Sequence, residues 1–403
     1  MVKAEAAVLN ARRRLEPYLA GTARVPELVP ASARVGLWRS LLGALRRPAS
    51  PEVVAVLSGT VGAARRYRCD HLVEQLRTAG FDARLCESDA RSLSEASEVA
   101  RAAVLHRVPW SAEIARLVDA VHRAGGSAWF NLDDLLFRRA HVNHLTFSGV
   151  RAEQDAEEHR QLADRYFETL SACDGVIAST ESLAHELRHE TAMPVHVVRN
   201  AASDEMLRRS ERARAEVAPF RDGAVVLGYL SGTPTHDRDF ATALPALVRL
   251  LRERAETALV LVGFADANGF PEDVRQRVLQ LPFQDWRQLP GLMRRLDLVL
   301  APLETPNRFT ECKSEVKYLE AGLVGVPTVA TATEAFTEAI EDGKSGYLVR
   351  SARAEEWFAK LAQACADPRR RAEIGAAALR DCLRRYTPRA RAPVLASLLR
   401  ARM

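Results

Sequence analysis

The sequence lacks the features that would place the protein in a membrane or in an oxidising compartment. No apolar run reaches the roughly 18–20 residues that a membrane-spanning helix needs. The opening residues, MVKAEAAVLNARRR, have no apolar core of the kind found in a signal peptide. The six cysteines are scattered without a C-x-x-C pair, so we expect reduced thiols and neither a disulfide framework nor a zinc knuckle. These absences predict a cytoplasmic protein.

Lysine is scarce as well, and the positive charge is concentrated at one end. Only five of the 57 basic residues are lysines. Residues 1–50 carry nine Lys and Arg against three Glu, a charge of +6, which leaves −1 for the rest of a chain whose total is +5. The body of the protein therefore gives no indication of nucleic-acid binding. We predict a basic helical extension over residues 1–50, in which 35–48 either contacts the inner face of the membrane or packs on the protein itself.

The remaining chain alternates short apolar strands with helices. A length of 403 residues with 47% apolar residues supports two domains with cores of their own. The alternation predicts parallel β-α-β units. We therefore expect an α/β fold of two Rossmann-like, doubly wound domains, residues 51–218 and 222–385, that face a central cleft. A C-terminal helix within 386–403 is expected to pack back on the N-terminal domain.

Two adjacent carboxylates, Asp133 and Asp134, end the predicted strand SAWFNLDD. The end of a parallel strand lies at the edge of the sheet where ligands bind, so a carboxylate there could orient an acceptor hydroxyl or stabilise positive charge on a sugar. The alternative is that one of them caps a helix formed by the following LLFRRA segment. Both interpretations remain open from the sequence.

The stretch FTECKSEVKYLEAGLVGVP, residues 309–327, is the most informative one. It runs from a loop into a predicted helix, and the start of a helix offers free N–H groups to an anion. Ser314, Lys317 and Glu320 recur every three residues along one side of that helix. Ser and Lys suit a diphosphate and Glu suits a ribose diol. The alternative is an amphipathic helix whose charges face water, and the use of Lys in an arginine-rich chain argues against it.

The segment HELRH, residues 185–189, matches the H-E-x-x-H pattern of zinc peptidases. In that interpretation His185 and His189 bind the metal, Glu186 is the base and Glu205 is a third ligand. The competing interpretation is the solvated face of a helix in an α/β unit, which the surrounding charges favour.

Four blocks in order carry a resemblance to a known family. They are LVLVG, LPGLMRRLDLVLAP, EVKYLEAGLVGVPTVAT and IEDGKSGYLV. They resemble the C-terminal domain of GT-B glycosyltransferases, in particular the retaining enzymes of glycosyltransferase family four. SLAHELR and VHVVRN resemble the end of that family's N-terminal domain. RYRCDHLVEQLRTAGFDA and WFNLDDLLF are similar to bacterial group 1 glycosyltransferases of the surface-polysaccharide type.

The resemblance implies roles for individual residues. Glu320 corresponds to the glutamate that holds the nucleotide ribose. The family often has another Glu eight residues upstream at the donor sugar, and that position is Cys312 here, with Glu311 beside it. The usual Arg and Lys after the first strand of the C-terminal domain are replaced by the loop SGTPTHDRDF, and His236, Arg238 or Lys317 is expected to neutralise the diphosphate in their place. Asp133 or Asp134 is expected to replace a histidine at the acceptor side.

The expected site has three parts. The donor nucleotide and diphosphate are assigned to Gly232, Thr233, Arg238, Thr310, Lys313, Ser314, Lys317 and Glu320. The acceptor side is assigned to Gly59, Arg65, Tyr67 and Arg68. The catalytic residues are assigned to Asp133, Asp134 and His236, and no metal or other cofactor is expected.

The implied function is transfer of a sugar from a nucleoside-diphosphate sugar to an acceptor hydroxyl, with retention, in bacterial glycan biosynthesis. The transferred group would be hexosyl or deoxyhexosyl, and the acceptor a glycan, a lipid-linked sugar or a small molecule. Two alternatives share the fold: a natural-product glycosyltransferase, and a sugar-nucleotide-binding protein or epimerase that transfers nothing to an acceptor.

Overall fold

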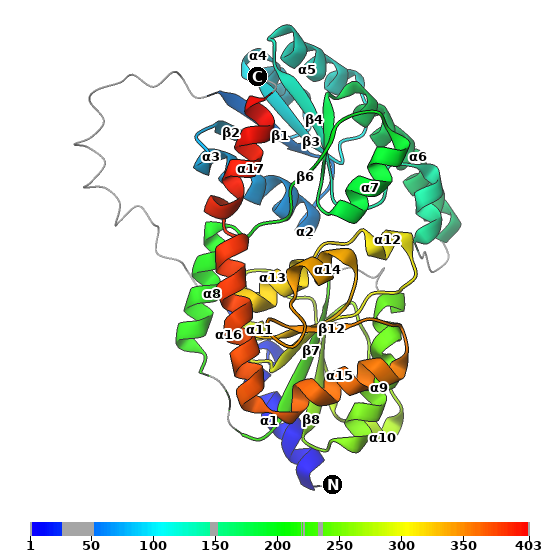
Figure 1. Ribbon diagram of the computed structural model, residues 1–403, viewed down its shortest axis with the longest axis vertical. Helices are drawn as coiled ribbons and strands as arrows, with labels where there is room; N and C mark the ends of the chain where they lie inside the picture. Colours follow the sequence, from blue (N-terminus) through cyan, green and yellow to red (C-terminus); the bar gives the residue numbers. More distant parts are fainter. Residues whose placement is uncertain are drawn as a thin grey trace, which may run out of the picture.

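The computed structural model describes residues 2–25, 52–145, 152–218, 220, 222–232 and 237–401. They form two α/β domains, one above the other in Figure 1, each built on a six-stranded sheet. Over these residues we find no helix that combines the length and the apolar character needed to cross a membrane. The helix expected around residues 35–48 falls outside the described part of the chain.

The N-terminal sheet is parallel, with the strand order β2-β1-β3-β4-β5-β6. Its strands are β1 (Val53–Ser58), β2 (Asp82–Cys86), β3 (Ala102–His106), β4 (Ser127–Leu132), β5 (Gly175–Ala178) and β6 (Val195–Val197). Its helical segments are α2 (Gly62–Arg65), the π-turn η2 (Arg66–Asp70), α3 (His71–Thr78), α4 (Ala90–Val99), α5 (Ala112–Arg123), the 3-10 turn η3 (Arg139–His144), α6 (Ala152–Ala172) and α7 (Glu181–Glu190).

Both faces of this sheet are covered, which explains its continuous apolar runs. Successive side chains of a strand point to opposite faces. Thus Ala55 and Leu57 pack with α4, α5, α6 and α7, while Val54 and Val56 pack with α3 and the C-terminal helix α17 (Pro388–Arg400). Strands of a parallel sheet that is covered on both faces have continuous apolar sequences rather than alternating apolar and polar residues.

The C-terminal sheet is also parallel, in the order β12-β11-β10-β7-β8-β9. Its strands are β7 (Val225–Ser231), β8 (Thr257–Gly263), β9 (Val278–Leu281), β10 (Leu298–Ala301), β11 (Thr328–Thr331) and β12 (Tyr347–Val349). Its helices are α9 (Asp237–Glu253), α10 (Glu272–Arg275), α11 (Leu289–Met293), α12 (Arg308–Glu311), α13 (Val316–Leu323), α14 (Glu334–Ala339), α15 (Ala354–Ala366) and α16 (Pro368–Arg385).

The two ends of the chain each pack on the domain that is distant in sequence. Helix α1 (Val2–Leu19) places Leu15 and Tyr18 against Val226 and Val260 of the C-terminal sheet. Helix α17 places Leu395 and Leu399 against α3 of the N-terminal domain. Figure 1 shows α16 and α17 as one red-orange line that joins the two domains on one side.

One helix that belongs by sequence to the expected N-terminal domain, residues 51–218, packs on the other domain. Helix α8 (Asp204–Glu216) falls within the predicted N-terminal domain, yet it packs on α11 of the C-terminal domain. Its Ala213 joins the same apolar cluster as Leu292, and its Met206 packs near Leu319. The helix is therefore held by its apolar face, which is complementary to the C-terminal domain rather than to the N-terminal sheet.

Candidate active site

A large cavity lies between the two domains, where the carboxyl ends of both sheets meet. Its volume is about 1370 Å³. The N-terminal domain lines it with the loop that follows β1 and with the residues after β4, and the C-terminal domain lines it with the ends of β7 and β10 and with α13. Ligands of doubly wound sheets bind at this edge, so the fold itself marks the cavity as the candidate site.

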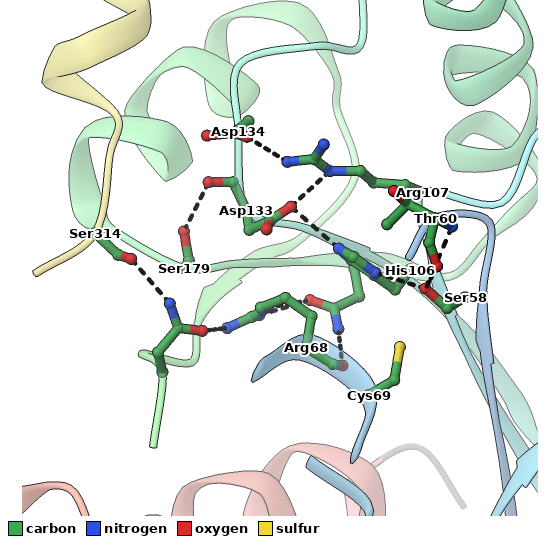
Figure 2. Close-up of polar contacts among 12 residues, drawn as sticks. Ser58, Thr60, Arg68, Cys69, His106, Arg107, Asp133, Asp134, Ser179 and Ser314 are labelled. Carbon is green, nitrogen blue, oxygen red and sulfur yellow. Dashed lines mark hydrogen bonds and ion pairs between the residues drawn. The ribbon is translucent and has the colours of Figure 1, made fainter. Parts of the chain in front are cut away.

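Asp133 and Asp134 form the N-terminal wall together with Arg107, which follows β3, and the buried His106 at the end of β3 lies behind them. Asp133 Oδ1 accepts hydrogen bonds from Arg107 Nε at 2.6 Å and lies 3.1 Å from His106 Nε2. Asp134 Oδ2 pairs with Arg107 Nη2, so one guanidinium holds both carboxylates (Figure 2). On its other side His106 Nδ1 lies 3.2 Å from Ser58 Oγ. Neither carboxylate caps a helix, because the next helical turn starts only at Arg139 and has no side-chain cap.

The backbone at Arg107 is held in an unusual conformation. Its φ is +47°, in the left-handed region that costs a non-glycine residue roughly 1–2 kcal/mol. Gly59 is packed against this residue so closely that a Cβ on Gly59 would lie 2.0 Å from the Arg107 carbonyl oxygen. Gly59 was expected to contact the acceptor; in the structure it makes room for the turn that aims Arg107 at the two carboxylates.

The surrounding charges determine the protonation of this wall. Burial alone would raise the pKa of Asp133, but the Arg107 charge and the His106 hydrogen bond hold it well below its usual range. Burial lowers the pKa of His106 despite the nearby carboxylate, so the ring is neutral at pH 7. Asp133 is therefore an ionised hydrogen-bond acceptor at neutral pH, suited to orienting a hydroxyl or stabilising positive charge and poorly suited to taking up a proton.

The opposite wall is formed by the segment from Lys313 to Glu320. Ser314 Oγ accepts a hydrogen bond from Asn200 Nδ2 at 2.9 Å. Lys317 Nζ donates to the Leu230 carbonyl at 2.5 Å. Burial lowers the pKa of the Lys317 ammonium group. Glu320 lies on the same wall, and Lys313 lines the cavity with its ammonium 4.8 Å from the Phe309 ring centre. The structure thus brings four predicted donor-site residues to one surface.

Two predicted acceptor residues have other positions. Arg68 is 1% exposed and does not line the cavity; it donates to Asn131, Asn200 and the Val198 carbonyl, so it is a buried structural cation. Tyr67 reaches across the cleft and donates to Glu320 Oε1 at 2.7 Å. It therefore belongs beside the donor wall. Arg65 does line the cavity and pairs with Glu87 at 2.8 Å.

The residues just before Lys313 do not reach the cavity. Thr310 donates to the Glu304 carbonyl, and Cys312 is packed in the apolar core of the N-terminal domain, where its carbonyl accepts from Thr180. Neither these two nor Glu311 line the cavity, so the donor roles expected for Thr310, Glu311 and Cys312 are not supported. The apolar side chain of Cys312 is buried because the two domains close on this loop.

The loop after β7 is described only in part. Gly232 lines the cavity, and no neighbouring atom lies within 4 Å of the Cβ position of this residue. Arg238 is exposed at the start of α9 and does not line the cavity, which differs from its expected role. Thr233 and His236 lie outside the described residues.

The zinc-peptidase pattern is occupied by other contacts. His185 and His189 lie with Nε2 atoms 3.1 Å apart, but Glu186 pairs with Arg308, and Glu205 pairs with Arg209 and Arg287. In the part of the chain that the structure describes, no group of three or more His, Cys, Asp or Glu could hold a metal. The segment is the solvated face of α7.

Sequence reasoning did not identify His106 or Arg107 as part of the site. Arg107 and His106 follow a strand that was predicted, yet nothing in a chain with 52 arginines distinguishes this one. The available signal was the position of both residues at the carboxyl end of a predicted parallel strand, next in the sheet to the strand that carries Asp133.

The comparisons with known proteins agree with this geometry. Residues 224–367 match the family model described as glycosyl transferases group 1. A D-inositol 3-phosphate glycosyltransferase of Segniliparus rotundus is 27% identical over 327 residues, which cover 75% of this chain and 68% of that protein.

Solved structures share the whole architecture. Anabaena HepE in complex with UDP and glucose aligns with a TM-score of 0.57 at 17% identity, covering 87% of this chain and 100% of HepE. Sucrose-phosphate synthase from Thermosynechococcus elongatus aligns with a TM-score of 0.58 at 15% identity, covering 87% and 98%. The predicted GT-B fold is thereby confirmed. The chain has the GT-B fold, and its residues 224–367 are similar to group 1 glycosyltransferases.

Proposed function

We propose that the protein transfers a hexosyl or deoxyhexosyl group from a nucleoside-diphosphate sugar to an acceptor hydroxyl, with retention at the anomeric carbon. The observation that carries the proposal is the pairing of two walls across one cavity. Lys313, Ser314 and Glu320 supply cationic, hydroxyl and carboxylate groups on one side, and Asp133 and Asp134 supply carboxylates on the other. A nucleotide and an acceptor hydroxyl need complementary walls of these two kinds.

On the donor wall the residues can bind a nucleotide and stabilise its departure. Arg66 Nη2 and Tyr67 both contact Glu320 Oε1, which leaves Oε2 to accept from a ribose diol. The first N–H groups of α13 have no partner within the helix and follow directly after Ser314. Together with the Lys313 ammonium they can stabilise negative charge on a leaving diphosphate, an effect worth about 10²–10³ in rate per preorganised donor.

On the acceptor wall the ionised Asp133 can fix the orientation of the attacking hydroxyl. Its carboxylate cannot serve as a proton store at neutral pH because Arg107 keeps its pKa low. Its negative charge also favours a sugar that develops positive charge as the leaving group departs. Retention in this proposal is supported by the resemblance of residues 222–385 to retaining enzymes.

Related proteins suggest which substrates to test first. HepE has been solved with UDP, with UDP and glucose, and with UDP-glucose, so UDP-sugars are the first donors of choice. The curated relative is named a D-inositol 3-phosphate glycosyltransferase, which makes a phosphorylated polyol the first small acceptor, beside lipid-linked and surface glycans. A place in bacterial glycan biosynthesis, in the cytoplasm and with membrane contact through residues 1–50, belongs to the same proposal.

The test is donor binding followed by transfer. The melting temperature of the wild type is measured with UDP-, dTDP-, GDP- and ADP-linked sugars, and the best donor is then assayed with each acceptor class. Glu320→Gln should weaken donor binding about 10- to 100-fold, as expected for the loss of a charged hydrogen bond. Glu355→Gln, a change at an exposed position of α15 away from the cavity, is the matched control.

The outcomes separate the alternatives. Transfer that persists in EDTA and gives a product with the donor's anomeric configuration supports metal-independent retention. Donor conversion in the absence of any acceptor would instead indicate an epimerase. Binding without turnover would indicate a sugar-nucleotide-binding protein, and a melting temperature that no nucleotide sugar changes would refute the proposal.

A further inference from the structure

Arg66 extends from the N-terminal domain into the donor side of the cleft. It lies in the turn η2 after β1, its side chain is only 10% exposed, and it lines the cavity. The central carbon of the guanidinium lies 4.7 Å from the ring centre of Tyr67 and 4.7 Å from that of Trp286. Its Nη2 lies 3.4 Å from Glu320 Oε1, the carboxylate proposed to bind ribose.

The contacts of Arg66 leave most of its hydrogen-bonding capacity unused. A guanidinium has five N–H donors, all directed outward in its plane. The contacts with the two rings involve the charge of the guanidinium rather than these N–H donors. The long contact with Glu320 is the polar contact that the described residues make with this side chain. A cation this buried normally has closer carboxylate or carbonyl partners.

Most other arginines of the cavity are neutralised by carboxylates. Arg107 is held by Asp133 and Asp134, Arg65 by Glu87, and Arg287 by Glu205 and Asp285. Arg66 differs because its nearest carboxylate is shared with Tyr67, which makes the shorter bond to the same oxygen. The positive charge of Arg66 is therefore available to an anion that enters the cavity.

We propose that Arg66 is a ligand of the donor's diphosphate, supplied across the cleft by the N-terminal domain. The inference rests on the proposed function, because it assumes a nucleoside-diphosphate sugar. The planar fork of a guanidinium matches two oxygens of a phosphate. In a nucleotide the diphosphate is attached to the same ribose that Glu320 Oε2 would bind, so a cation beside Glu320 is within reach of it.

This assignment explains how the site can work without the basic pair that usually follows the first C-terminal strand. The leaving diphosphate would be bound by Lys313 and the start of α13 on one side and by Arg66 on the other. Tyr67 then has a separate, positioning role: its hydroxyl fixes Glu320 Oε1 and keeps Oε2 directed to the ribose. A bound donor would join the two domains through Arg66.

The test compares ligands with and without phosphate. Dissociation constants of the wild type, Arg66→Met and Arg66→Lys are measured by calorimetry for the nucleoside diphosphate that the wild type binds best. The corresponding free nucleoside is measured by NMR titration. Arg66→Met should weaken the diphosphate about 10- to 100-fold and leave the nucleoside within about twofold, whereas Arg66→Lys should recover part of the loss.

The control is Arg138→Met. Arg138 also lies over an aromatic ring, that of Phe167, and pairs with Glu190, but it does not line the cavity, so its loss should change neither constant. Equal losses for the diphosphate and the nucleoside would show that Arg66 only supports Glu320, and unchanged diphosphate affinity would also overturn the inference. If the wild type binds no nucleoside diphosphate, the proposed function fails first and this inference with it.

Discussion

At the scale of single residues, Arg107 controls both carboxylates of the acceptor wall. One guanidinium contacts Asp133 and Asp134, and its charge opposes the effect of burial on the pKa of Asp133. A residue that only packed between the domains would have no such effect on protonation. Arg107 is thus a positioning residue that sets both the direction and the charge of the groups facing the acceptor.

We predict that Arg107→Gln changes the pH dependence of transfer as well as its rate. Without the guanidinium the pKa of Asp133 rises, so on lowering the pH its carboxylate becomes protonated, and activity is lost, at a higher pH than in the wild type. The measurement is kcat/KM against pH, with circular dichroism to verify folding. A lower rate with the same acidic limb would contradict this role.

A second prediction concerns the glycine that supports Arg107. In Gly59→Ala the new Cβ would overlap the Arg107 carbonyl, so β1 and the Arg107 turn must separate. We expect a loss of about 1–3 kcal/mol in unfolding free energy together with lower transfer activity. Gly125→Ala, away from the cavity, is the comparison: its φ of +74° is strained but its Cβ position is open, so it should leave transfer much less affected. Similar activities of the two variants would count against the argument.

Local spacing in the sequence places some candidate residues close together, whereas a contact between distant residues leaves no signal in the sequence. Lys317 and Glu320 lie three residues apart in α13 and Ser314 lies just before that helix, and this spacing can be read from the chain. The bond from Tyr67 to Glu320 joins residues 253 positions apart, and the burial of Cys312 depends on how the two domains meet. Neither has any local pattern, so Tyr67 was expected beside the acceptor and Cys312 beside the donor sugar.

At the scale of elements, α1 is an integral part of the C-terminal domain. Arg14, whose side chain is 1% exposed, pairs with Asp222 at 2.5 Å and with Asp297 at 2.6 Å, just before β7 and β10. The carboxylates more than offset the effect of burial, and the pKa of Arg14 is raised. The basic N-terminal segment therefore contains a structural ion pair, which its net charge alone does not reveal.

We predict that Arg14→Met destabilises the C-terminal domain by about 3–5 kcal/mol, because two carboxylates lose their buried partner. The adjacent Arg13 is a matched control: its side chain is 64% exposed and lies 3.7 Å from Asp222, so Arg13→Met should cost less than about 1 kcal/mol. Urea denaturation of both variants measures the difference. Equal stabilities would show that α1 is held by its apolar contacts alone.

Elements were predictable to the extent that they form apolar runs of sufficient length. The seven-residue run Thr257–Gly263 is almost wholly apolar, as expected for a strand of a covered parallel sheet, and forms β8. The four-residue β9 is short and has an exposed Gln280, so its sequence carries little indication of a strand. The small residues of α13 have a structural explanation as well: Gly322 packs against Cys382 and Ala378 of α16, with no room for a side chain. Helix packing, as well as ligand approach, thus accounts for glycine there.

At the scale of the whole molecule, the contacts between the domains converge on the donor wall. Tyr67 contacts Glu320, Asn200 contacts Ser314, and Thr180 contacts the Cys312 carbonyl. The segment from Cys312 to Glu320 therefore carries both contacts between the domains and the proposed nucleotide-binding residues. Domain closure and organisation of the donor site are consequently coupled.

Arg199 offers a way to test that coupling, because it bridges the domains without lining the cavity. It pairs with Glu338, with Glu334 at 3.0 Å and with Glu315 at 3.5 Å, the last just before α13. We predict that Arg199→Met favours an open cleft, since three carboxylates of the C-terminal domain lose a partner that is only 6% exposed. The radius of gyration from small-angle scattering should increase, and donor affinity should fall several-fold.

The matched control for this prediction is Arg188→Met, which removes an exposed pair with Glu181 within α7 and crosses no domain boundary. It should change neither quantity. A further arm adds the donor at saturation: if closure and binding are coupled, donor should return the Arg199→Met variant to the compact shape, because a ligand that contacts both domains stabilises the closed state. A variant that binds donor as the wild type does, and scatters as it does, would show that the two domains are held together independently of the donor wall.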